Sequence, residues 1–192
     1  MAKHENPWKT SSVREIYDNP WINVSEHQVI NPSGNPGIYG KVSFKNLACG
    51  IIPLDDDGNT WIVGQHRYTL DRYSWEIPMG GVALGTDPMT GARQELKEET
   101  GLSASRWEKI LTVHISNSIT DEAGFVYVAE GLEQGKTAFD DTEKIEIRQL
   151  PFAELLQMTM QGEITDLLSV AGILKLAALR PFLTGPNSDN EK

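Results

Sequence analysis

Alternation of apolar and polar residues marks the beginning of the chain. The segments 13–17, 21–30 and 38–45 alternate in this way, and they are separated by Asn-Pro and by the turn-rich NPSGNPG at 31–37. This pattern predicts half-buried strands joined by turns. We therefore expect a small antiparallel sheet, preceded by a loosely held polar arm over residues 1–12. A sheet of this size is hard to stabilise alone, so it should pack on the main domain or on a partner chain.

Two apolar runs follow, LACGIIPL at 47–54 and TWIVGQHRY at 60–68, and they predict buried strands. The three aspartates at 55–57 between them could be a metal cluster. The Asp-Gly pair between two strands favours a tight hairpin turn instead. Further strands are expected at 106–115, 124–130 and 144–150.

The remaining periodic stretches predict helices. One begins at Pro88, with Thr86 or Asp87 as its N-cap, and stops at Gly101. A second runs from Pro151 to about Met160. A third runs from about 165 to 183, and the residues expected on one side of it are Leu167, Leu168, Ala171, Leu174 and Ala178. Mixed strands with one central and one terminal helical layer predict an α/β fold, an α/β/α sandwich with a mixed sheet.

The helix before Gly101 carries an unusual group of charges. Glu95, Glu98 and Glu99 stand at i, i+3 and i+4, so their carboxylates project from one helical face. Lys97 is too close in sequence to neutralise them. Hard cations such as Mg²⁺ bind a few carboxylates together with substrate phosphate oxygens, so the triplet is a candidate metal site. A solvated acidic face is the alternative, and the helix alone does not separate the two.

Composition narrows the function classes. The chain has 192 residues, with 27 acidic and 17 basic side chains and a net charge of −10. It lacks the basic surface that binding to nucleic acid or an anionic membrane requires. The single cysteine, Cys49, excludes an intramolecular disulfide and favours a cytoplasmic location. No run approaches the ~20 apolar residues of a membrane span, and the N-terminus lacks the apolar core of a signal peptide.

The stretch Gly80 to Leu102, GGVALGTDPMTGARQELKEETGL, resembles the box of the Nudix hydrolases, G-x5-E-x7-R-E-U-x-E-E-x-G-U, where U is aliphatic. The matching positions are Gly80, Glu95, Leu96, Glu98, Glu99, Gly101 and Leu102. The family's first Glu and its Arg are replaced by Thr86 and Gln94. The resemblance implies the α/β/α sandwich and metal ligation by Glu95, Glu98 and Glu99 and by the carbonyl of Met79. Mg²⁺ is the expected cofactor, with Mn²⁺ as a substitute.

Further segments resemble the ADP-ribose pyrophosphatase branch of this family, which hydrolyses nucleoside diphosphate sugars. They occur in that branch's order along nearly the whole chain, namely the N-terminal sheet, QHRY, WEIP, SNSITDE and GEITDLLSVAGIL. The resemblance makes Glu122 the general base, and Asp121 beside it is equally plausible. Glu98 is a second catalytic candidate. A loop carboxylate can accept a proton more readily than one that already ligates Mg²⁺.

Substrate contacts are expected from several other residues. Arg67 matches a phosphate-binding arginine, although it could instead cap a strand or pair with Asp71. Glu76 matches an acid that can join the metal cluster, and its alternative is a buried ion pair with Arg67 or Arg72. Aromatic side chains in the N-terminal sheet could stack a nucleobase or simply form a core. These are Tyr17, Trp21 and Tyr39.

These observations predict a division into an N-terminal arm and sheet at 1–46, a catalytic domain at 47–184 and a disordered tail at 185–192. The resemblance implies Mg²⁺-dependent cleavage of a nucleotide sugar to a nucleoside monophosphate and a sugar phosphate, by a homodimer formed through the N-terminal sheet. One rival is a nucleoside triphosphate pyrophosphohydrolase. Another is a domain that senses nucleotide sugars without cleaving them.

Overall fold

The computed structural model describes residues 5–135 and 145–185, so the expected tail beyond Gly185 lies outside the described residues. The chain divides into two units. The first comprises the residues up to Asn46 together with His114–Glu122, and the second comprises Leu47–Val113 and the residues from Ala123 onward. No helix in the described ranges is both long enough and apolar enough to span a membrane.

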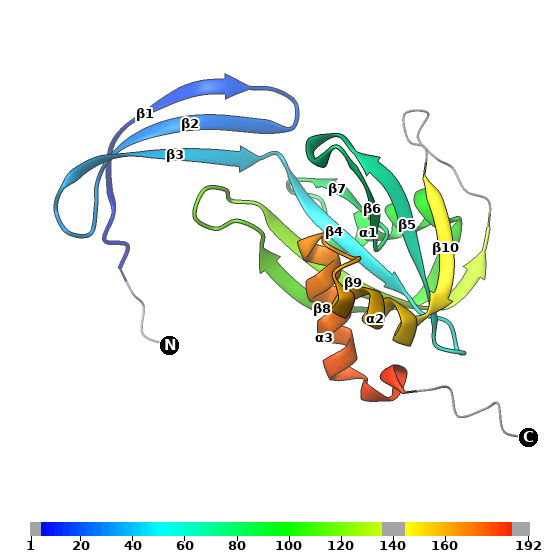
Figure 1. Ribbon diagram of the computed structural model, residues 1–192. Helices are drawn as coiled ribbons and strands as arrows, with labels where there is room; N and C mark the ends of the chain where they lie inside the picture. The colour runs from blue at the N-terminus through cyan, green and yellow to red at the C-terminus, as the bar shows by residue number, and fades with distance from the viewer. Residues whose placement is uncertain (1–4, 136–144, 186–192) are drawn as a thin grey trace, which may run out of the picture. The chain divides into compact units, whose positions relative to one another are not determined.

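The N-terminal unit contains the expected antiparallel sheet, drawn in blue in Figure 1, with the strand order β1-β2-β3. Its strands are β1 (Lys9–Asp18), β2 (Ile22–Ile30) and β3 (Pro36–Phe44). The register pairs Tyr17 with Val24 and His27 with Tyr39. Strand β1 begins at Lys9, so the expected arm over residues 1–12 is too long. Backbone pairing with β2 orders these polar residues without burying them, and every side chain of β1 is exposed.

The second unit is built on parallel pairing of two central strands. Strand β4 (Asn46–Pro53) pairs with β9 (Ala123–Gln134), and the strand order of this sheet is β7-β4-β9-β8. The outer strands are β7 (Met79–Ala83) and β8 (Leu102–His114). A second sheet has the order β10-β5-β6 and contains β10 (Glu146–Pro151), β5 (Asn59–Arg67) and β6 (Arg72–Glu76). The tight turn expected before β5 is present, because Asp55 Oδ1 accepts from the backbone N–H of Asn59 at 2.7 Å and Gly58 has φ 80°. The flanking strands β4 and β5 belong to different sheets and are joined by one antiparallel bridge, between Leu54 and Thr60.

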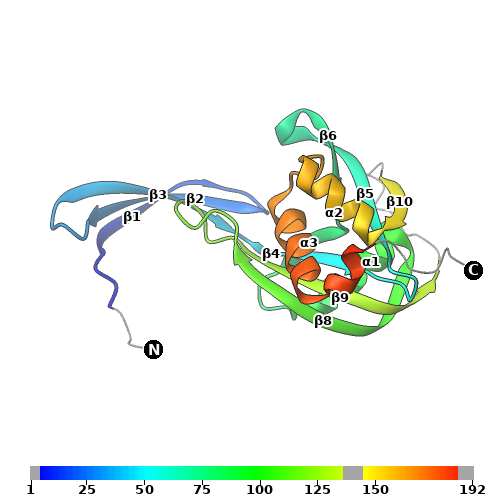
Figure 2. The same ribbon diagram turned by 60° about the horizontal axis from the view of Figure 1, so that its bottom comes forward.

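Alternate residues of the central strands enter different cores, which shows that helices cover both faces of the sheet. Ile51 of β4 packs in the core that contains Ala92 and Leu96 of α1 (Pro88–Thr100). Its neighbour Ile52 packs in the core formed with α2 (Phe152–Gln161) and α3 (Leu167–Leu179). Figure 2 shows α2 and α3 together in orange, and the two helices contact each other. The predicted α/β/α sandwich with a mixed sheet is confirmed.

Helix α3 differs from the prediction in its end and in its buried face. It stops at Leu179 rather than continuing to 183, because Pro181 disfavours helical geometry at Arg180. The chain then forms a short 3-10 turn, η2 (Pro181–Thr184). Leu167 and Leu174 are exposed, whereas the buried residues are Leu168, Ser169, Gly172, Ile173 and Leu176. Close approach to β9 selects this face, since a Cβ on Gly172 would lie 2.9 Å from Val126 Cγ1.

Thr60 of β5 offers a test of core energetics. Among the buried side-chain oxygens and nitrogens of the described residues, only Thr60 Oγ1 has no hydrogen-bond partner. A buried hydroxyl without a partner costs about 1–3 kcal/mol, and valine has nearly the same shape. We expect Thr60→Val to raise the free energy of unfolding, measured in urea, by about 1 kcal/mol.

Thr100→Val is the matched control for this substitution. Thr100 is also buried, but its hydroxyl donates to the Leu96 carbonyl and accepts from the Leu102 N–H. The control should therefore lose stability. An equal loss in both variants would contradict the assignment of an unsatisfied hydroxyl to Thr60.

Candidate active site

Helix α1 forms because both of its ends are capped by local residues. The Asp87 side chain accepts from the backbone N–H of Met89, and Pro88 occupies the first helical position. Of the two expected N-caps, Asp87 is therefore the one used. Gly101 ends the helix in the left-handed conformation at φ 75°, which glycine adopts without strain. These caps fix where the three glutamates of the last two turns project.

Two of those glutamates lie against the first residues of β7. Glu99 is 5% exposed, and its Oε2 accepts a hydrogen bond from the backbone N–H of Met79 at 2.9 Å. Glu95 fills the space above Gly80, where an added Cβ would lie 2.0 Å from its Cδ. The two carboxylates and the backbone at Met79 and Gly80 thus lie together. The box glycine is required because a side chain would compete with Glu95.

Glu98 is turned to a different partner. Its Oε1 accepts from Gln94 Nε2 at 2.9 Å, one turn earlier on the helix. Gln94 occupies the position of the family's Arg, so a neutral amide hydrogen-bonds to a carboxylate of the box at this position. The described residues contain no cluster of three or more His, Cys, Asp or Glu side chains already arranged to hold a metal ion.

The donors present nevertheless suit Mg²⁺. All are oxygens, and Mg²⁺ commonly binds through one or two carboxylates while substrate phosphates and waters complete its octahedron. Glu95 and Glu99 supply such a pair beside the chain at Met79 and Gly80. A rotation about the side chain of Glu98, which lies on the same helical face, would add a third carboxylate.

Arg67 and Glu76 form a partly buried ion pair on the neighbouring strands β5 and β6. Arg67 Nε donates to Glu76 Oε1 at 3.0 Å, and its Nη2 contacts Oε2. Glu76 is only 3% exposed. Hydrogen bonding to Glu76 raises the pKa of Arg67, and the charges of Asp166 and Glu99 act in the same direction. The sequence left Asp71 and Glu76 open as partners of Arg67. The structure pairs Arg67 with Glu76, and this contact fixes the guanidinium near Glu99.

Ser169, at the start of α3, supports this region and was not found from the sequence. Its hydroxyl accepts from the backbone N–H of Ile77 at 3.1 Å and donates to the N-cap Asp166 at 2.8 Å. Ile77 lies between Glu76 and Met79, so α3 anchors the chain that enters the box. The sequence TDLLS carries a capping signal, but no pattern indicates the long-range bond to Ile77.

Glu122 and Asp121 belong to the N-terminal unit, unlike the box. Asp121 is paired with Lys41, with 2.8 Å between Oδ2 and Nζ, and its Oδ1 accepts from the Phe44 N–H. Burial raises the pKa of Asp121, but hydrogen bonds from Lys41, Ser43 and Phe44 outweigh that effect and leave it below its usual value. A carboxylate held in this way is a poor proton acceptor, which counts against Asp121 as the base.

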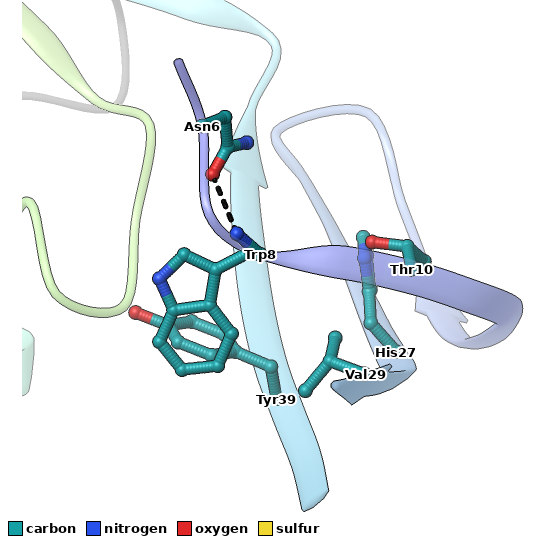
Figure 3. A pocket seen from close by; sticks show the side chains of 6 residues that line it. All are labelled: Asn6, Trp8, Thr10, His27, Val29 and Tyr39. Carbon is teal, nitrogen blue, oxygen red and sulfur yellow. Dashed lines mark hydrogen bonds between the residues drawn. The ribbon is translucent and has the colours of Figure 1, made fainter. Parts of the chain in front are cut away.

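The aromatic candidates of the N-terminal sheet occupy two environments. Tyr17 and Trp21 are 55% and 66% exposed. Tyr39 packs edge-on against Trp8, with the ring centroids 5.4 Å apart. Figure 3 shows these two rings together among the side chains that line a pocket. The pocket has a volume of about 210 Å³. Its other lining residues are Asn6, Thr10, His27 and Val29.

Cys49 is not a candidate nucleophile. It is fully buried on β4, and its thiol contacts the Pro88 carbonyl at 3.5 Å. Burial raises the pKa of the thiol to about 11, and the negative charges of Glu95 and Asp87 add to this effect. The thiolate that nucleophilic chemistry requires is therefore scarce at neutral pH.

Comparisons with known proteins identify the family of this chain. Residues 45–168 match the NUDIX domain, and residues 8–42 match the nucleoside diphosphate sugar hydrolase N-terminal domain. The chain is 32% identical to the ADP-ribose pyrophosphatase of Mycobacterium tuberculosis (strain ATCC 25618 / H37Rv), over 97% of this chain and 90% of that protein. It is 29% identical to the ADP-ribose pyrophosphatase of Bacillus subtilis (strain 168), over 82% and 86% of the two chains.

A solved structure titled an ADP compounds hydrolase has the same fold, with a TM-score of 0.83 at 16% identity, over 94% of this chain and 98% of that one. The domain match covers more than half of the sequence, and the box geometry lies within it. The chain therefore belongs to the Nudix family, in the branch that contains the ADP-ribose pyrophosphatases, and is a hydrolase of phosphorus-containing anhydrides.

Proposed function

We propose that the protein hydrolyses the diphosphate of a nucleoside diphosphate sugar, such as ADP-ribose or GDP-mannose, in a Mg²⁺-dependent reaction. The products are a nucleoside monophosphate and a sugar phosphate. The observation that carries this proposal is the match of residues 8–42 to the N-terminal domain of nucleoside diphosphate sugar hydrolases, directly before the Nudix domain. Homologues named for ADP-ribose match 97% and 82% of the chain and support the same substrate class.

Glu95, Glu98 and Glu99, the carbonyl of Met79 and, as a further candidate, Glu76 would hold the metal. The chemistry that Mg²⁺ supplies in such a site is the acidification of a bound water and the screening of the diphosphate charge. Mn²⁺ could take its place. The hydrogen bond from the Met79 N–H fixes one of these carboxylates before any ligand arrives.

Glu122 would accept the proton of the attacking water, with Glu98 as the second candidate for this role. Arg67, held in place by Glu76, would contact the diphosphate. Tyr17, Trp21 and Tyr39 would contact the nucleobase. A general base on a residue that does not ligate the metal is expected, because a carboxylate that ligates Mg²⁺ accepts a proton poorly.

We also propose that the protein is a cytoplasmic homodimer that pairs through its N-terminal sheet. Large apolar side chains are exposed on β1, on β3 and in the turn between β1 and β2, among them Val13, Ile38 and Trp21 at 59%, 67% and 66%. Exposed apolar side chains gathered on one element are typical of interaction surfaces. Light scattering of the full chain tests the dimer.

A substrate panel tests the proposed reaction. The full chain is incubated with Mg²⁺ and ADP-ribose, ADP-glucose, GDP-mannose or UDP-glucose, followed by a phosphatase that releases phosphate from monoesters. We expect phosphate from at least one nucleotide sugar, since both products are monoesters. Pyrophosphate from dGTP with no nucleotide-sugar cleavage would favour the triphosphate alternative, and tight ADP-ribose binding without turnover would favour a sensing domain.

A further inference from the structure

One face of β3 holds the chain segment that carries Glu122. Tyr39, Lys41 and Ser43 alternate along the strand, so their side chains share a face. The Tyr39 hydroxyl donates to the Ser118 carbonyl at 2.6 Å. Lys41 and Ser43 both bond the carboxylate of Asp121. Three successive side chains on this face therefore contact residues 118–121.

The backbone reinforces these contacts. The Val42 N–H donates to the Ile119 carbonyl at 2.9 Å, and the Asp121 N–H donates to the Val42 carbonyl at 3.3 Å. Val42 and Thr120 form an isolated parallel bridge. The Ile115 N–H donates to the Glu122 carbonyl at 3.3 Å, which joins the two ends of the segment. The segment thus adds a short edge to the N-terminal sheet, with Glu122 one residue beyond the ion pair.

We propose that Lys41 and Asp121 are positioning residues for hydrolysis, and that their ion pair fixes segment 114–122 on β3 and thereby sets the place of the Glu122 carboxylate. This inference rests on the proposed function, in which Glu122 is the general base. Neither residue needs to touch the substrate. Loss of the pair should lower kcat and leave KM nearly unchanged, because proton transfer depends on the position of the base.

The chain provides a matched control for the Lys41–Asp121 pair. Lys45 and Asp18 form an ion pair at 2.7 Å in the same unit, with side chains 39% and 45% exposed, against 40% and 42% for Lys41 and Asp121. The control pair does not involve segment 114–122. Lys41→Met and Lys45→Met therefore remove the same charge from equally exposed ion pairs.

We expect Lys41→Met to lower kcat for ADP-ribose about tenfold, since a misplacement of about 1 Å can cost up to 10²-fold. Lys45→Met should stay within about twofold of the wild type. Lys41→Arg keeps the ion pair and should also stay within about twofold. Hydrogen exchange of the amides at 118–122 should become faster in Lys41→Met and remain unchanged in Lys45→Met.

A double-mutant cycle separates positioning from a general structural role. Glu122→Gln should lower kcat by at least about 100-fold through loss of the base. In that background, Lys41→Met should change kcat less than about twofold, because its effect acts through Glu122. A tenfold loss that persists in the Glu122→Gln background would overturn the proposal.

The inference and the proposed function fail in different ways. An active wild type with a strongly impaired Glu122→Gln and an unaffected Lys41→Met would overturn the positioning role and leave the function standing. A wild type that cleaves no nucleotide sugar would count against the function. Equal amide exchange at 118–122 in the Lys41→Met and Lys45→Met variants would then overturn the fixing of the segment by the ion pair.

Discussion

Glu99→Gln should abolish nearly all hydrolysis while leaving the fold intact. Gln retains an oxygen that can accept from the Met79 N–H, so the contact between α1 and β7 survives. The lost negative charge removes a proposed metal ligand, and metal ligation supplies several kcal/mol of transition-state stabilisation. We expect kcat for ADP-ribose at saturating Mg²⁺ to fall by roughly 10³-fold, which corresponds to about 4 kcal/mol.

Thermal unfolding and a second glutamine variant control this experiment. The melting temperature of Glu99→Gln should lie close to that of the wild type. Glu163→Gln removes an equal charge from an exposed position between α2 and α3, and its kcat should be unchanged. Hydrolysis that survives in Glu99→Gln at saturating Mg²⁺ would show that the metal-binding role is misassigned.

Gly80→Ala should also lower activity with little loss of stability. The added Cβ would lie 2.0–2.3 Å from the carboxylate atoms of Glu95. Gly80 does not have positive φ, so alanine fits the backbone. The flexible end of Glu95 can move aside at little cost in stability, but its carboxylate must leave the position beside β7. A displacement of about 1 Å can lower kcat by about 10²-fold, and we expect a loss of that size.

Gly37→Ala is the control for the glycine substitution. An added Cβ at Gly37 meets no atom within 4 Å, and this glycine also lacks positive φ. Its kcat should match the wild type. Steady-state kinetics with ADP-ribose and urea unfolding of both variants provide the comparison. Unimpaired kinetics in Gly80→Ala would mean that the location of Glu95 beside β7 is not needed for the reaction.

Short-range signals predicted much of the fold. The alternation at 13–45, the Asp-Gly turn before β5 and the caps of α1 each involve neighbours in sequence, and each is confirmed in type. The family was also predicted, because the box positions have fixed spacing, and its branch was predicted from the order of the further matching segments. Periodicity did not predict the buried face of α3, because apolar residues occur on both faces of this helix. Contact between Gly172 and β9 decided which face is buried, and that contact is remote in sequence.

The contacts of the site were less predictable from the sequence, because they also join residues that are remote along the chain. Spacing placed Glu95 and Glu99 on one helical face, but only the fold shows that they meet Gly80 and Met79. The partner of Arg67 remained open between Asp71 and Glu76 until the register of β5 and β6 was known. The roles of Ser169 and Lys41 depend on partners roughly 80 or more residues away in the sequence, as their contacts with Ile77 and Asp121 show.

The N-terminal unit is assembled from two separate stretches of chain, since His114–Glu122 joins the residues up to Asn46. The boundary of this unit therefore cannot be drawn as a single cut in the sequence. A chimera that exchanged only the first 46 residues with those of a relative would pair a foreign β3 with the native segment 114–122. A chimera designed to keep this unit intact therefore has to exchange both stretches together.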